Sequence, residues 1–201
     1  LIIPSIDMAE AQGVISWLPA VIGFLGGGVF LRICDQYLPH LHIGMPKTEA
    51  EGIPTSWHRS TLLVLAITLH NIPEGLSVGV SYASDVNETG NLIAFAIGLQ
   101  NAPEGFLVAL FLLNQNIGKL KSFLIATLTG TVEIAGALLG FFLTSYVDFL
   151  IPYGLSFAAG AMLFIIYKEL IPESHGDGNE RNATYSFIIG ILLMIVLIEM
   201  F

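Results

Sequence analysis

Two stretches of the sequence place ionisable and amide side chains inside long apolar runs. They are residues 70–75, which read HNIPEG, and residues 100–105, which read QNAPEG, so that Asn, Pro, Glu and Gly recur 30 residues apart. Helical positions three and four residues apart share a face, so His70 and Glu74 point the same way, and the second stretch repeats this spacing. Two such helices facing each other would bring carboxylates, an imidazole and amide groups to one point. The candidate metal ligands from this pattern are His70, Asn71, Glu74, Gln100, Asn101 and Glu104.

A further carboxylate, Glu133, lies about half-way along another apolar run. A carboxylate inside a membrane segment marks a functional site by default, because burying it unpaired is costly. We therefore expect Glu133 to be a further ligand or a group that bridges two ions. The alternative is a protonated Glu133 bonded to a neighbouring helix. For the paired stretches, the alternative is that their polar groups merely bond each other across two helices.

This donor set suits a borderline divalent cation. Imidazole together with carboxylates suits Zn²⁺, with Fe²⁺, Mn²⁺, Co²⁺ and Cd²⁺ as competitors. Amide oxygens are weak ligands, so the mixed set can strip water from a cation and still release it, as conduction and transport require. With Glu74, Glu104 and Glu133 there are enough carboxylates to hold two ions.

Proline and glycine recur within the same stretches. Pro73 and Pro103 have no N–H, so the carbonyl four residues earlier loses its helical partner, and each helix is expected to kink. Gly75 and Gly105 are expected to allow neighbouring helices to approach closely.

The composition predicts an all-α, polytopic membrane protein. Of its 201 residues 54% are hydrophobic and 11% charged, whereas a soluble domain is about 25% charged. Seven Lys and Arg residues are too few for the basic patch of a nucleic-acid partner. A membrane helix needs roughly 20 apolar residues. Six segments meet this length, near 16–37, 60–82, 91–113, 122–146, 149–171 and 184–201.

The regions outside the spans are expected to differ in role. Residues 1–15 are interpreted as the end of a preceding transmembrane helix and an outer loop, and residues 16–201 as the transmembrane domain. The loop 38–59 carries His40 and His42, which are expected to be solvated loop residues, with transient metal binding as the alternative.

The end of the fifth segment carries a second group of polar residues. Lys168 and Glu169 are expected to anchor the helix at the membrane interface. A role for Glu169, Glu173 or His175 along an exit path is the alternative.

The basic residues predict the orientation of the chain. Lys and Arg occur in alternate loops only, while the other loops are acidic, so the basic loops are expected to face the cytoplasm and the C-terminus the outside. The basic loop residues are Lys47, Arg59, Lys119, Lys121 and Arg181, and the acidic ones in the other loops are Asp85, Glu88 and Asp148.

At these residues the sequence resembles the ZIP (Zrt/Irt-like) family of divalent metal transporters, and most of all its GufA-like branch. The resemblance is carried by residues 70–75 and 100–105, by Glu133, and by the ELIPE run at residues 169–173. It implies eight transmembrane helices, of which the six here would be the third to the eighth, with the two N-terminal helices missing. It also implies uptake of Zn²⁺, Fe²⁺, Mn²⁺ or Cd²⁺ across the plasma membrane (the bacterial inner membrane) by alternating access.

The resemblance also implies how the site is divided. The primary site would use His70, Glu74, Gln100 and Glu104, and the adjacent second site would use Asn71, Asn101, Glu104 and Glu133. Some members carry an acidic residue where Asn101 stands, so the second site would be weaker here.

An intramembrane metal-dependent hydrolase is the competing class of function. Such an enzyme uses a metal-bound water and usually three strong protein ligands. The pattern here offers one histidine, several amides and no evident nucleophile or base, so we expect a transporter and not an enzyme. The expected partners are divalent metal ions, as transported substrate and not as cofactor, and the lipid bilayer, with a homodimer as one option.

Overall fold

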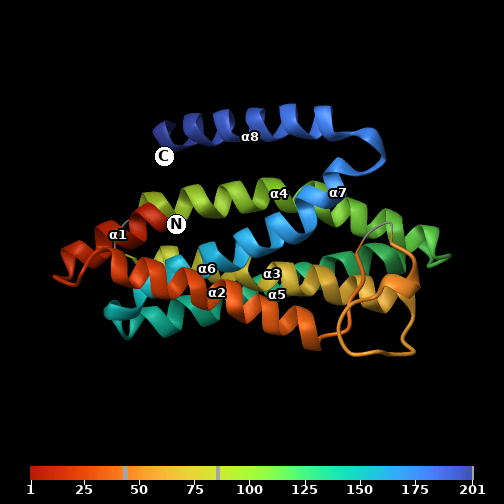
Figure 1. The fold of residues 1–201 in the computed structure, drawn as a ribbon, viewed down its shortest axis with the longest axis horizontal. Helices are drawn as coiled ribbons and strands as arrows, with labels where there is room; N and C mark the ends of the chain where they lie inside the picture. The colour runs from red at the N-terminus through yellow and green to blue at the C-terminus, as the bar shows by residue number, and fades with distance from the viewer. Residues whose placement is uncertain (43–44, 85–86, 201) are drawn as a thin grey trace.

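A computed structural model describes residues 1–42, 45–84 and 87–200, and within these ranges the chain is a bundle of helices without a strand (Figure 1). The side chains of residues 87 and 88 are not among those described, and neither is Asp85. The helices are α1 (Ile2–Ala11), α2 (Trp17–Tyr37), α3 (Arg59–Ala83), α4 (Asn87–Asn114), α5 (Lys119–Ser145), α6 (Ile151–Ile165), α7 (Ile171–His175) and α8 (Glu180–Met200).

The prediction of six membrane spans is confirmed. Six helical segments in the described part of the chain are long and apolar enough to cross a membrane. The fifth span is composite, because α6 continues through a π-helical segment, Ile166–Leu170, into α7. Pro172 explains the irregularity, since it has no N–H to donate to the carbonyl four residues earlier. π-Helical turns inside α-helices occur frequently at functional sites.

Close backbone contacts hold the bundle together. A Cβ atom on Gly75 of α3 would lie 2.2 Å from the carbonyl oxygen of Glu133 on α5, and one on Gly27 of α2 would lie 1.9 Å from that of Phe157 on α6. Helices in lipid associate largely through such packing, because lipid tails are as apolar as the side chains. The expectation of a similar close approach at Gly105 is wrong, because its Cβ would meet no atom within 4 Å.

Helix α8 lies at the edge of the bundle (Figure 1). Only 6% of its most apolar stretch is buried inside the protein, and most of its large apolar side chains are exposed, with Leu197 buried.

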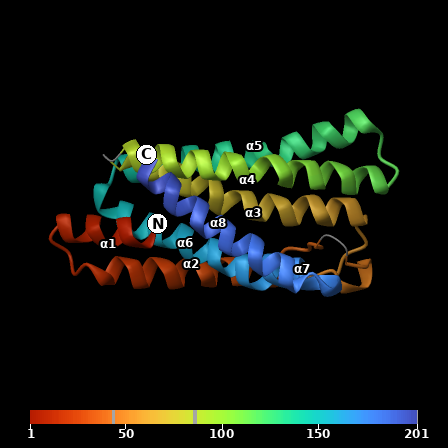
Figure 2. The same ribbon diagram turned by 90° about the horizontal axis from the view of Figure 1, so that it is seen from above.

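All seven Lys and Arg residues gather at one end of the bundle. Figures 1 and 2 show this end, where the loop 38–58, the α4–α5 turn and the α7–α8 connection lie together. The opposite end carries the α1–α2 and α5–α6 turns, and no Lys or Arg lies there in the described residues. The charge asymmetry along the sequence is therefore an asymmetry between the two ends of the molecule.

Candidate metal centre

The two repeated stretches lie on α3 and α4 and face each other. Both helices continue through their internal prolines, Pro73 and Pro103, so the polar side chains keep the helical spacing; the kinks stay a prediction. The Gln100 amide nitrogen donates to Glu74 Oε1 at 2.5 Å across the interface. The two stretches that match in sequence therefore also contact each other in the fold.

Four of the predicted ligands surround one cavity of about 260 Å³, namely His70, Glu74, Gln100 and Glu104. Glu74 is buried, and its second oxygen, Oε2, has no hydrogen-bond partner among the described residues. Glu104 Oε1 is in the same situation. A buried carboxylate oxygen without a partner is costly, so a cation or a proton is needed to stabilise this arrangement.

The remaining predicted ligands lie directly beside this cavity. Asn101 donates its amide nitrogen to Glu133 Oε1 at 2.5 Å, and Asn101 Oδ1 is buried without a partner among the described residues. Asn71 donates to the backbone oxygen of Thr129 at 2.9 Å. A small cavity of about 50 Å³ is lined by Asn71, Asn101 and Glu104. Since Glu104 lines both cavities, the two groups of residues adjoin each other.

The side-chain amides of Gln100 and Asn101 contact these carboxylates in a way that suits reversible binding of a cation. An Asn or Gln side chain can donate N–H to a carboxylate or offer its oxygen to a cation. Gln100 and Asn101 here donate to Glu74 and Glu133. The same side chains could therefore hold the carboxylates in place or join them as ligands.

His70, which lines the cavity with the other three candidate ligands, also contacts Glu169 of the π-helical segment. Its Nε2 lies 2.5 Å from Glu169 Oε2. Glu169 is 6% exposed, so the expectation that it anchors the helix at the membrane interface is wrong. Two features of the sequence pointed to Glu169 as a candidate functional residue. They are the run ELIPE at residues 169–173 and the position of an acidic residue in an apolar segment.

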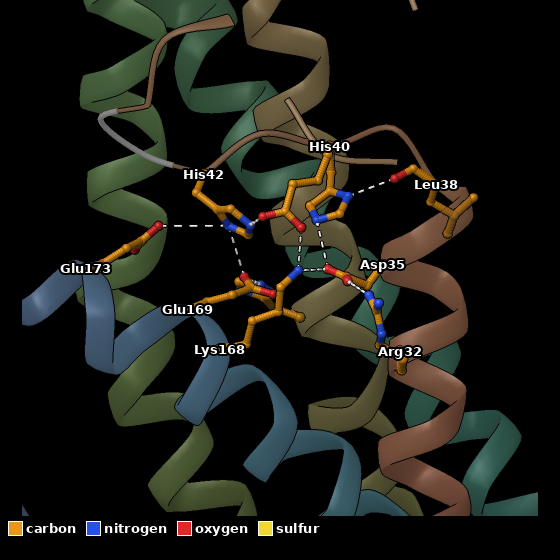
Figure 3. A network of polar contacts seen from close by, with 10 residues as sticks. Arg32, Asp35, Leu38, His40, His42, Lys168, Glu169 and Glu173 are labelled. Atoms are coloured by element: carbon orange, nitrogen blue, oxygen red, sulfur yellow. Dashed lines mark hydrogen bonds and ion pairs between the residues drawn. The ribbon is translucent and has the colours of Figure 1, made fainter. Parts of the chain in front are cut away.

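Glu169 also contacts His42, one of the two loop histidines. His42 Nδ1 lies 3.0 Å from Glu169 Oε2 and 3.8 Å from Glu173 Oε1 (Figure 3). Burial lowers the pKa of the His42 imidazole, but its hydrogen bond to Glu169 and the nearby carboxylates outweigh this and hold the pKa above its ordinary value. His42 and Glu173 line the same 260 Å³ cavity as His70.

The expectation that the loop histidines are solvated is wrong. His40 is 2% exposed and His42 11% exposed. His40 and Glu51 exchange two backbone hydrogen bonds, of 3.2 and 3.0 Å, which fold the loop back on itself. His175 Nδ1 contacts the Ile171 carbonyl oxygen of its own helix at 2.8 Å.

Two groups of three potential metal-ligand residues occur in the described residues, and both include His40 of this loop. The ligand atoms of His40, His42 and Glu51 lie within 4.8 Å of one another, as do those of Asp35, His40 and Glu169. Lys168 contacts both Asp35 and Glu51 in the same place (Figure 3). Asp35 was not recognised from the sequence, where it stands in no repeated pattern, and Lys168 was expected only to anchor its helix at the membrane interface.

Comparison with known proteins gives consistent matches. The family profile described as "ZIP Zinc transporter" matches residues 46–198. The chain is 44% identical over 200 residues to "Zinc transporter GufA" of Myxococcus xanthus, covering 98% of this chain and 78% of that protein. It is 32% identical over 273 residues to "Zinc transporter ZIP11" of Xenopus tropicalis, covering 98% and 81%. It is 36% identical over 192 residues to "Zinc transporter ZupT" of Streptococcus mutans, covering 92% and 72%.

Proposed function

The chain belongs to the ZIP family of metal transporters, and we propose that it takes divalent cations, Zn²⁺ above all, into the cytoplasm through the cavity between α3 and α4. It is a multi-pass membrane protein with six spans in the described residues. The family membership and the zinc transporters among its relatives support transport over the competing hydrolase.

The observation that carries the proposal is a pair of buried carboxylate oxygens in this cavity that have no hydrogen-bond partner among the described residues. Glu74 Oε2 and Glu104 Oε1 are buried, and both residues line the cavity with His70 and Gln100. Carboxylate and imidazole groups together are the ligands that Zn²⁺ and similar borderline cations take. We assign the primary transport site to these four residues.

A second cation position beside the first is part of the proposal. Asn71, Asn101 and Glu133 would complete it, with Glu104 shared between the two positions. Support comes from the adjoining cavities that Glu104 lines and from the contact between Asn101 and Glu133.

A route from this site toward the basic end of the bundle follows from the same cavity. His70 contacts Glu169, and Glu169 contacts His42, which lies in the loop at that end. Imidazole and carboxylate side chains are both common ligands of divalent metals. By the positive-inside rule the basic end faces the cytoplasm and the C-terminus the outside. A cation leaving the primary site by this route therefore enters the cytoplasm, and alternating access would open the site to the two sides in turn.

Uptake by purified protein in liposomes tests the proposal. Wild-type protein should accumulate Zn²⁺, and Glu74→Ala and Glu104→Ala should lose both uptake and a bound ion, because each removes a charge and a ligand together. Glu180→Gln is the matched control, because it changes a carboxylate at the start of α8, away from the cavity. Wild-type uptake and metal content in folded Glu74→Ala and Glu104→Ala would show that the repeated stretches are structural.

A further inference from the structure

A lysine of this chain lies in the middle of a group of metal-ligand side chains. The Lys168 ammonium contacts Asp35 Oδ1 and Glu51 Oε2 together (Figure 3). Asp35 is 5% exposed and lies near the end of α2, while Glu51 belongs to the loop. One ammonium group therefore spans two carboxylates from separate elements.

His40 completes the group. Its Nδ1 lies 2.7 Å from the carbonyl oxygen of Leu38, and because a carbonyl can only accept, Nδ1 carries the hydrogen. In the neutral ring Nε2 is then the atom with the free lone pair, which is the form in which histidine binds a metal. This Nε2 lies 3.4 Å from Asp35 Oδ1, the same oxygen that Lys168 contacts.

The donor set is therefore that of a divalent cation site. The Lys168 ammonium lies between the carboxylates of Asp35 and Glu51, and His40 Nε2 lies beside Asp35. One imidazole nitrogen and two carboxylate oxygens are the kinds and number of protein ligands found in many zinc sites. His40 belongs to both ligand groups found in the described residues, one with His42 and Glu51 and the other with Asp35 and Glu169, so each group shares two residues with this set.

We propose that Asp35, His40 and Glu51 form a cation site that the chain fills with its own Lys168 ammonium. Because the lysine is covalently part of the chain, its ammonium group stays in the site and prevents a metal ion from binding there. The neighbouring Glu169, adjacent to Lys168 in sequence, contacts His42 and His70, and its carboxylate also lies within 4.8 Å of ligand atoms of Asp35 and His40. Because the filled site excludes the transported metal ion, the ion passes along the side of Glu169 and His42. In this consequence the inference rests on the proposed function.

A purely structural lysine is the competing explanation. Lys168 links α2, the loop and the π-helical segment, so a simple ion-pair clamp would also account for its contacts. The two explanations differ in what neutral replacement does. If Lys168 is only an ion-pair clamp, its neutral replacement loosens the loop and no additional metal binds. If Lys168 fills a cation site, its neutral replacement empties that site, which then binds a metal ion.

Metal stoichiometry of the full chain in detergent separates them. Wild type, Lys168→Met, Lys168→Gln and Lys168→Arg are equilibrated with Zn²⁺, and bound zinc per folded chain is measured after size-exclusion chromatography. Lys168→Met and Lys168→Gln should each bind about one ion more than wild type, and added Zn²⁺ should raise their Tm more than that of wild type. Lys168→Arg, which keeps a fixed cation, should match wild type. The additional ion should disappear in the double variant Lys168→Met with Asp35→Asn.

The outcomes distinguish this inference from the proposed function. If wild type takes up Zn²⁺ but neither neutral variant binds an additional ion, the lysine is only a clamp and the inference is overturned. If Lys168→Met does not fold, Lys168→Gln carries the test, because its amide is shorter and polar. A wild type that neither binds nor takes up Zn²⁺ contradicts the proposed function, whatever the Lys168 variants bind.

Discussion

The two glycines at matching positions of the repeated stretches should respond differently to alanine. The new Cβ of Gly75→Ala would lie 2.2 Å from the carbonyl oxygen of Glu133 and 2.7 Å from its Cα, and all three of its nearest neighbours are backbone atoms. The new Cβ of Gly105→Ala would meet no atom within 4 Å. The same chemical change at equivalent positions therefore produces a clash in one helix and none in the other.

The magnitude follows from the distances. Ordinary van der Waals contact for a Cβ begins at 3.4 Å, so α5 must move by roughly 1 Å at Glu133, because backbone atoms cannot rotate away. Overpacking of this kind costs about 1–3 kcal/mol. A misplacement of about 1 Å at a functional group can lower its activity by as much as roughly 100-fold. We expect Gly75→Ala to lose the metal position that uses Glu133 and most of the uptake.

Zinc content, uptake into liposomes and thermal unfolding should be measured for both variants beside wild type. Gly75→Ala should show a lower Tm, less bound zinc and slower uptake, while Gly105→Ala should stay close to wild type in all three. Equal behaviour of the two variants would refute the reasoning, because it would mean that the contact between Gly75 and Glu133 does not position the site.

Three further changes test other parts of the account. His70→Ala should weaken Zn²⁺ binding and shift competition in uptake assays toward harder cations such as Mn²⁺, because the nitrogen donor is lost; unchanged selectivity would contradict the role of His70. Glu133→Gln should lower the bound metal from two ions toward one while retaining part of the uptake, and full zinc content would exclude Glu133 as a ligand. Cysteines at Thr48 and Tyr146, in a Cys34→Ser background, should react with an impermeant reagent from opposite sides of the membrane; labelling of both in intact cells would contradict the orientation.

The parts of the fold that could be predicted from the sequence are those with a local signal. Span length and hydropathy predicted the six membrane helices. The repeated spacing of His70 with Glu74 and of Gln100 with Glu104 predicted that α3 and α4 face each other, and the cavity they line bears this out. Each of these signals can be read from the sequence of one helix or from a comparison of the sequences of two helices.

The parts that could not be predicted depend on contacts between distant segments. His70 and Glu169 are 99 residues apart in sequence, and Asp35 and Lys168 are 133 residues apart. Their pairing depends on how the π-helical segment before Pro172 directs its side chains, and neither apolar periodicity nor spacing carries that information. The different roles of Gly75 and Gly105 have the same origin, because only the packing of α5 on α3 distinguishes them.

The most direct test of the central claim is to locate the ion itself. Anomalous diffraction from crystals of the wild-type protein grown with Cd²⁺ or Zn²⁺ would show where the cation binds. The account predicts a peak in the cavity between α3 and α4, bounded by His70, Glu74, Gln100 and Glu104, with a second peak beside Asn101 and Glu133. Peaks confined to the loop at His40 and His42, in protein that still takes up zinc, would contradict it.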